Sequence, residues 1–239
     1  MRVAILGYGK MGKAIEPILI ERGHEIVLKV NSENPLKSSD LNGVDVAIEV
    51  SRPDLAMFHI EQCMSAKVPI VVGTTGWYQH LSEIKTKVEN EGLHLLYATN
   101  FSIGVHMVFA LNQILAKWMN QYPDYTPSIE EIHHTAKLDA PSGTGITLAE
   151  GILDNLDRKD HWVNRLSETE NELALTSIRE ENVPGTHTVS YVSGVDTIEL
   201  KHIAHNRNGF ALGAVQAAEW LIKNPGIHSM QEFLNFTTI

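Results

Sequence analysis

Residues 131–144, Glu-Ile-His-His-Thr-Ala-Lys-Leu-Asp-Ala-Pro-Ser-Gly-Thr, bring together side chains that could carry out chemistry. His133 and His134 have ordinary pKa values near neutrality, so either can move a proton. Lys137 adds a full positive charge three residues later. Taken singly, two adjacent histidines are compatible with ordinary surface residues, and Ser142 with a simple helix cap. Their combination predicts acid–base chemistry on an anionic small molecule.

The elements around this stretch predict an anion site. Residues 129–134 have the pattern of a strand end, and the apolar positions after Thr144 predict a helix over 146–155. The Pro-Ser-Gly-Thr turn then places Ser142 or Thr144 near a helix N-terminus. Free backbone N–H groups and the positive end of the helix dipole bind anions there. We therefore expect a carboxylate-binding cradle with an acid–base group beside it.

Composition excludes several classes of protein. The chain has 239 residues, 43% of them hydrophobic, which predicts one or two globular domains. Its 19 basic and 29 acidic residues give a net charge of −10, which argues against a nucleic-acid partner. No apolar run is long enough to span a bilayer, and Met1 leads directly into a predicted strand, without room for a signal peptide. The single cysteine, Cys63, is typical of a reducing compartment. We expect a cytoplasmic enzyme with neither a membrane nor a nucleic-acid partner.

The N-terminus carries a glycine fingerprint. An apolar strand over 2–6 is followed by Gly7-Tyr8-Gly9-Lys10-Met11-Gly12, a helix, and a second strand over 25–30. This is the order that the dinucleotide-binding fingerprint requires. Gly7 makes the tight turn, Gly9 lets the backbone approach a pyrophosphate, and Gly12 lets the helix pack on the strand. The alternative is a purely structural glycine-rich turn.

Three more strands, over 44–50, 69–72 and 93–98, alternate with helices over 54–66 and 80–91. This alternation predicts a Rossmann-like, doubly wound parallel sheet. Ligands bind outside the carboxyl ends of such strands, so the loops there form a predicted cofactor rim. The predicted cofactor-binding residues are Gly7, Tyr8, Gly9, Lys10, Met11, Gly12, Asn31, Ser51, Gly73, Thr74, Thr75, Thr99, Asn100, Phe101 and Arg207.

The chain changes character after a long helix predicted over 103–119. Residues 157–172 are polar and show no clear pattern. Strands over 175–179, 187–192 and 196–202 then follow one another without helices, which predicts a mixed or antiparallel sheet in a second, α+β domain. Helices over 213–223 and 227–233 complete the chain. We expect a dinucleotide-binding domain over 1–103 and 207–239, and a substrate-binding and oligomerisation domain over 104–206.

A metal is not expected. His202 and His205 stand three residues apart, but no cysteine or carboxylate pattern accompanies them.

The motif Glu131-x-His133-His134-x-x-Lys137-x-Asp139-Ala140-Pro141-Ser142-Gly143-Thr144 resembles the signature of the dihydrodipicolinate reductase family. The resemblance runs over essentially the whole chain. It includes Gly73-Thr74-Thr75-Gly76, Asn100-Phe101-Ser102-x-Gly104, Arg179 with Gly185-x-His187, and Arg207 ahead of Gly213-Ala214.

The resemblance implies reduction of 4-hydroxy-tetrahydrodipicolinate, a cyclic dicarboxylate, to tetrahydrodipicolinate in lysine and diaminopimelate synthesis. NADPH, NADH or both would be the cofactor. By position in the motif, His133 would be the general acid and Lys137 the substrate-binding or acid–base cation. The residues that would hold the carboxylates are His134, Ser142, Gly143 and Thr144. The resemblance also implies a homotetramer built through the sheet of the second domain.

The end of the second strand bears on the choice of cofactor. NADH enzymes usually place an acidic residue there to bind the ribose hydroxyls, whereas this chain has Asn31. Lys10 and Lys13 add positive charge, and Glu33 is the one opposing feature. We expect NADPH to be accepted at least as well as NADH. Two other functions stay open: another reductase of this fold, such as an aspartate-type dehydrogenase, and a nucleotide sensor without catalysis.

Overall fold

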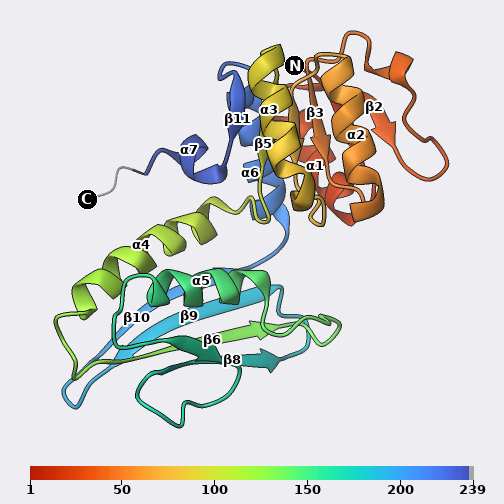
Figure 1. The fold of residues 1–239 in the computed structure, drawn as a ribbon. Helices are drawn as coiled ribbons and strands as arrows, with labels where there is room; N and C mark the ends of the chain where they lie inside the picture. The colour runs from red at the N-terminus through yellow and green to blue at the C-terminus, as the bar shows by residue number, and fades with distance from the viewer. Residues whose placement is uncertain (237–239) are drawn as a thin grey trace. The chain divides into compact units, whose positions relative to one another are not determined.

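The structure is a computed structural model and describes residues 1–236. The chain forms two compact units (Figure 1). The first combines Met1–Ile103 with Arg207–Phe236, and the second is the intervening Gly104–Asn206. Residues 237–239 of the predicted first domain lie outside the described residues. No helix among residues 1–236 is both long and apolar enough to cross a membrane.

The first unit contains a six-stranded parallel sheet in the order β11-β5-β4-β3-β1-β2. The strands are β1 (Arg2–Leu6), β2 (Glu25–Val30), β3 (Val46–Glu49), β4 (Ile70–Val72), β5 (His94–Tyr97) and β11 (Gly226–His228). The central strands are buried apolar runs, as expected for a parallel sheet covered on both faces.

Helices cover both faces of this sheet (Figure 1). They are α1 (Lys10–Glu21), α2 (Pro53–Ser65), α3 (Leu81–Glu91), α6 (Asn208–Leu221) and α7 (Met230–Leu234), with 3₁₀ turns at Ser38–Leu41 and Tyr78–His80. Alternate residues of β1 point to opposite faces. Val3 and Ile5 pack with α1 and α6, while Ala4 and Leu6 pack with α2 and α3. The predicted Rossmann-like fold is confirmed.

One sequence prediction in this unit is wrong. Residues 227–233 were expected to form a helix, but Gly226–His228 form β11, which pairs in parallel with β5, and α7 begins only at Met230. A three-residue strand is too short to show an alternating pattern, and its pairing with β5 depends on tertiary contacts.

The second unit contains a five-stranded sheet in the order β10-β9-β6-β8-β7. Its strands are β6 (Thr126–His133), β7 (His161–Val163), β8 (Glu172–Arg179), β9 (Gly185–Val192) and β10 (Thr197–Ala204). Helices α4 (Ile103–Met119) and α5 (Gly143–Leu153) lie on one side of this sheet (Figure 1). They pack against Ile129, Leu173, Leu175 and Val189 to form the core of the unit.

The sheet is mixed, so a wholly antiparallel arrangement is excluded. β9 pairs antiparallel with β6 and β10, but β8 runs parallel to β6 and β7. Although β8 and β9 are consecutive, β6 lies between them. The strand β7 falls within residues 157–172, where the sequence showed no pattern. It has three residues at the sheet edge, which again is too short to show alternation.

Candidate active site

The glycine-rich turn joins β1 to α1. Gly7 has a φ of 108°, and a Cβ there would lie 2.6 Å from the backbone of Ser51, so the turn requires glycine. The N–H groups of Gly7 and Tyr8 donate to the carbonyl of Val30 at 3.1 and 2.8 Å. Helix α1 then begins at Lys10 without a side-chain cap. The first N–H groups of an uncapped helix are suited to bind a phosphate.

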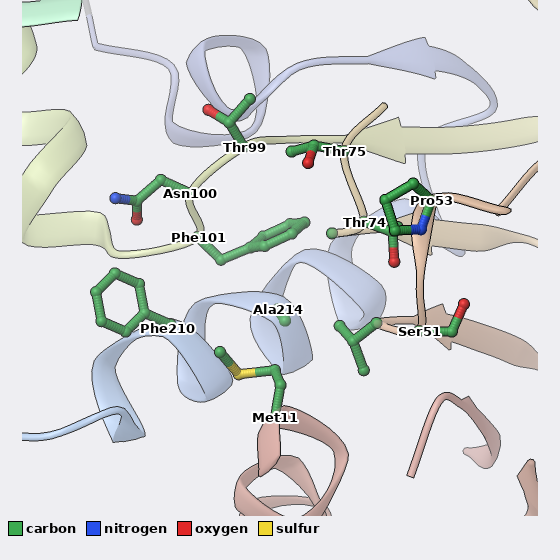
Figure 2. Close-up of a pocket in the computed structure, with 12 residues that line it drawn as sticks. Met11, Ser51, Pro53, Thr74, Thr75, Thr99, Asn100, Phe101, Phe210 and Ala214 are labelled. Carbon is green, nitrogen blue, oxygen red and sulfur yellow. The ribbon is translucent and has the colours of Figure 1, made fainter. Parts of the chain in front are cut away.

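A cavity of about 290 Å³ opens beyond the carboxyl ends of β3, β4 and β5 (Figure 2). It is lined by Met11, Val50, Ser51, Pro53, Gly73, Thr74, Thr75, Thr99, Asn100, Phe101, Phe210 and Ala214. Figure 2 shows the ring of Phe101 extending from the loop after β5 toward Thr74, with Met11 rising from α1. The Thr74 hydroxyl is buried without a hydrogen-bond partner. Buried hydroxyls normally have a partner, so a flat ligand that carries a polar group, such as a nicotinamide ring, fits this cavity.

The structure brings eight predicted cofactor residues together around this cavity: Met11, Ser51, Gly73, Thr74, Thr75, Thr99, Asn100 and Phe101. Gly7, Tyr8, Gly9, Lys10 and Gly12 instead form the glycine turn and the start of α1. Asn31 lies at the end of β2, and Arg207 precedes α6. Sequence reasoning missed Val50, Pro53, Phe210 and Ala214, because apolar lining residues look like ordinary core positions.

The end of β2 is already hydrogen-bonded. The side-chain carbonyl of Asn31 accepts from the N–H groups of Glu33 and Asn34 at 2.9 and 2.8 Å. Its amide group can therefore act only as a donor. The Lys29 ammonium and the Tyr8 hydroxyl both donate to Glu16, so the charge of Lys29 is already paired at this rim.

A buried carboxylate, that of Glu49, holds the Ser51 loop of the predicted cofactor rim. Glu49, at the end of β3, accepts from the backbone N–H of Ser51 at 3.1 Å and from its hydroxyl, and lies 3.2 Å from His59 Nδ1. Both Glu49 and His59 are buried. This network fixes the Ser51 loop against the Gly7 turn.

In the second unit, Ser142 caps α5. Its hydroxyl oxygen accepts from the N–H of Gly145 at 3.0 Å. Its own N–H donates to the two carboxylate oxygens of Glu131, at 2.9 and 3.1 Å, and its hydroxyl donates to the same group. Gly143 and Thr144 form the first turn of the helix, which begins where the sequence motif predicts a cradle.

Glu131 is fully buried among donors. Besides Ser142, the Ser177 hydroxyl donates to it at 2.9 Å, and His187 Nε2 lies 3.6 Å away. Burial alone would raise the pKa of this carboxyl, but the nearby His187 and the hydrogen bonds from Ser142 and Ser177 lower it to about 2. Glu131 is therefore ionised at neutral pH.

His133 lies beside this carboxylate, with its Nδ1 3.9 Å from Glu131. Its ring meets that of His187 edge to face, with centroids 5.0 Å apart. Burial lowers the pKa of His133 to about 4, helped by the electrostatic effect of His187 and by the positive charges of Lys137 and Arg179, although Glu131 opposes the shift. His133 is consequently neutral near pH 7 in the absence of a ligand.

Arg179 shapes the loop after His133. Its guanidinium donates to the carbonyls of Lys137 and Asp139 at 3.3 and 2.6 Å. The Lys137 ammonium donates to both oxygens of Asp139 at 2.8 Å. Two of the three ammonium donors of Lys137 are thus used by Asp139. The loop is already built around a carboxylate–ammonium pair.

A family assignment follows from the sequence comparisons. Residues 1–101 match the family described as "Dihydrodipicolinate reductase, N-terminus" and residues 104–234 match "Dihydrodipicolinate reductase, C-terminus". The chain belongs to the dihydrodipicolinate reductase family.

Two relatives cover nearly the whole chain. A 4-hydroxy-tetrahydrodipicolinate reductase of Christiangramia forsetii is 46% identical over 98% of both chains. One of Rickettsia bellii is 37% identical over 94% of this chain and 90% of its own. Among solved structures, dipicolinate-bound dihydrodipicolinate reductase from Paenisporosarcina sp. TG-14 has a TM-score of 0.81 at 22% identity, covering 98% of this chain and 99% of its own. This last comparison shows a common fold.

The structure places the predicted substrate residues in different surroundings. His133 lies by Glu131, the charge of Lys137 acts on His133, and Gly143 and Thr144 open α5. Ser142 is buried, and its hydroxyl is already engaged by Glu131 and Gly145. His134 is half-buried, and its carbonyl accepts from the Lys137 N–H at 3.1 Å. The catalytic and carboxylate-binding roles of all six remain predictions.

The sequence reading gave no site role to four supporting groups: Glu131 and His187, which are buried, and Ser177 and Arg179, which are half-buried. One signal was available. Glu131 and His133 stand two apart on a strand and so share a face. Ser177 and His187 reach the site only through the pairing of β8 and β9 with β6.

Glu131, His133 and His187 offer three ligand atoms within 4.8 Å of one another, a group that could hold a cation. Both oxygens of Glu131 already accept hydrogen bonds, however. The expectation of no metal stays a prediction.

Proposed function

We infer that this chain reduces 4-hydroxy-tetrahydrodipicolinate to tetrahydrodipicolinate in lysine and diaminopimelate synthesis. The reaction adds one hydride and one proton and releases one water. Relatives of that name match nearly the whole chain. The observation that carries the proposal is the start of α5, where the Ser142 cap stands beside His133 and Lys137. It offers a diacid the N–H groups of a helix N-terminus, an ammonium and an imidazole.

A nicotinamide cofactor supplies the hydride when bound. We propose that the uncapped start of α1 binds its pyrophosphate and that the cavity at Thr74 and Phe101 takes the ring. NADPH is accepted at least as well as NADH, because Asn31 presents an amide donor, not a carboxylate, at the end of β2. Arg207 and Lys10 contribute positive charge to this unit.

His133 serves as the proton donor. In the free protein its ring is neutral at pH 7, because its pKa is lowered to about 4. A bound dicarboxylate brings negative charge close to the ring, which raises its pKa and favours the imidazolium. Substrate binding thus prepares the acid. His134, Ser142, Gly143 and Thr144, with Lys137, hold the two carboxylates.

The decisive test is oxidation of NADPH or NADH at 340 nm, with substrate made in situ by the preceding synthase. Turnover that requires both the synthase product and the cofactor supports the reductase. Cofactor binding without turnover indicates a nucleotide sensor. Turnover with an acyclic 2-oxo acid and ammonia instead indicates an amino-acid dehydrogenase.

We further propose a homotetramer that works in the cytoplasm, with the first unit binding the cofactor and the second binding substrate and mediating assembly. Opposite α4 and α5, the second sheet carries exposed apolar side chains. Ile178, Val192 and Ile203 are 37%, 45% and 51% exposed, and Ile178 and Ile203 lie in one row across the paired strands. Exposed apolar sheet faces of this kind are typical of subunit interfaces.

A further inference from the structure

We propose that Glu131 is a positioning residue of the substrate site, which anchors the start of α5 and supplies the counter-charge for the His133–His187 pair. This inference rests on the proposed function, because it concerns how the same site is held ready. Glu131 is fully buried, so it acts through its neighbours, without touching the substrate.

The first part of the role is geometric. The Glu131 carboxylate accepts from the N–H and the hydroxyl of Ser142, and Ser142 in turn accepts from the N–H of Gly145. Strand β6 thus holds the first turn of α5 through two hydrogen bonds from Ser142 to Glu131 and one from Gly145 to Ser142. The N–H groups of Gly143 and Thr144 belong to that turn, so their aim depends on Glu131.

The helix is built to receive this carboxylate. A Cβ at Gly145 would lie 2.6 Å from Glu131 Oε2. Any larger residue would push the carboxylate or the helix start out of place. Glycine is otherwise a poor helix residue, so close approach of the carboxylate explains its presence in the first turn.

The second part of the role is electrostatic. Four cationic or titratable groups surround His133: His187, Lys137, Arg179 and the carboxylate itself. Only Glu131 among them is negative. Its distances to His133, His187 and Arg179 are 3.9, 3.6 and 4.0 Å. Without this charge, a proton on His133 would face the cations Lys137 and Arg179 and the His187 ring, with no negative group among these neighbours.

Two substitutions separate the two parts. Glu131→Gln keeps the length and an acceptor but removes the charge. We expect the titration of His133 to move to lower pH by about one unit, which lowers the imidazolium population about tenfold. The pH profile of kcat should move the same way, with little change in KM. Glu131→Asp keeps the charge but withdraws it by one methylene, so KM should rise while the profile stays.

Gly145→Ala tests the geometry from the other side. Alanine favours helices more than glycine does, so weaker binding in this variant cannot come from a weaker helix. We expect it to resemble Glu131→Asp. Glu150→Gln, an exposed glutamate on the same helix, is the matched control and should behave as the wild type.

Two readouts do not depend on turnover: NMR titration of the histidine rings in the free protein, and calorimetric binding of dipicolinate as a planar diacid probe. A wild-type protein without turnover would refute the proposed function, while these two measurements still decide the role of Glu131. A wild-type His133 titration in Glu131→Gln, together with wild-type dipicolinate affinity in Glu131→Asp and Gly145→Ala, would overturn this inference.

Discussion

Two opposing effects act on the pKa of His133. The ring must be buried to exclude water, yet burial favours its neutral form, and its pKa falls to about 4. The nearby carboxylate of Glu131 opposes this shift, and the dicarboxylate substrate adds to that effect. In the proposed mechanism, the proton therefore becomes available when the ligand arrives.

We predict that His133→Gln lowers kcat by about 10²–10⁴-fold, the usual contribution of a positioned acid. Cofactor affinity should stay nearly unchanged, because the proposed cofactor residues belong to the other unit. Steady-state kinetics and cofactor titration check both statements. His161→Gln, an exposed histidine of β7, is the control. Near-wild-type turnover of His133→Gln across the pH range would refute the assignment.

Burial of Cys63 has the opposite effect on pKa and favours the protonated thiol. Its thiol is fully buried in α2, and burial, aided by the negative charge of Glu49, raises its pKa to about 12. Because the thiolate is the reactive form, we predict that a disulfide reagent at pH 8 leaves the native protein unlabelled. One thiol per chain should react after unfolding in guanidinium. Rapid labelling of the native protein would contradict this.

At the scale of elements, the loop after β6 depends on a residue from β8. Arg179 holds two carbonyls of the Lys137–Asp139 segment. Lysine cannot reproduce this fork, so we predict that Arg179→Lys raises the KM for substrate roughly ten- to a hundredfold, the cost of a charge-assisted hydrogen bond. Arg165→Lys, which alters a guanidinium paired with Glu172, should leave KM unchanged. Equal effects of the two substitutions would refute the role of Arg179.

The elements also show what a sequence encodes locally. Helix α4 spans the predicted residues 103–119, because a long apolar periodicity needs no distant partner. The glycine turn could likewise be predicted, since its φ and close contacts admit only glycine. The short strands β7 and β11 could not, because pairing alone creates them. The same holds for the candidate site: the motif gives His133 and Lys137, but Ser177 lies 46 residues from Glu131 and meets it only through the pairing of β6 with β8.

At the scale of the whole molecule, stability should depend on pH in two steps. The pKa of His133 is lowered from 6.5 to about 4, so the unfolded chain binds a proton in that range that the folded chain does not. Stability therefore falls as pH drops from 6.5 to 4. Glu131, with a pKa lowered from 4.5 to about 2, contributes stability above pH 4.5 that is lost below it.

We predict a melting temperature that declines from about pH 6.5 downward. His133→Gln should reduce the first step and leave the second, while His202, whose pKa is also lowered by burial, accounts for what remains of the first. Calorimetry across pH 3–8 on both proteins checks this. A first step of unchanged size in the variant would show that other groups cause it.

Assembly is the second prediction at this scale. Ile203→Glu places a charge in the exposed apolar row of the second sheet, so we expect a species smaller than the tetramer by light scattering. Ile20→Glu, which alters an exposed position of α1 in the first unit, should leave the mass unchanged. A wild-type monomer, or a tetrameric Ile203→Glu, would refute the proposed interface.

The interrupted course of the first unit has a consequence for the ribosome. Its sheet lacks β11, and its second face lacks α6, until residues after Arg207 have been made. The second unit, a continuous stretch of chain, has been synthesised completely before then. Domains usually fold during synthesis from the N-terminus onward. Here the second unit has all of its residues before the first unit does. A released chain that ends at residue 206 should hold a protease-resistant second unit and an open first sheet that binds chaperones.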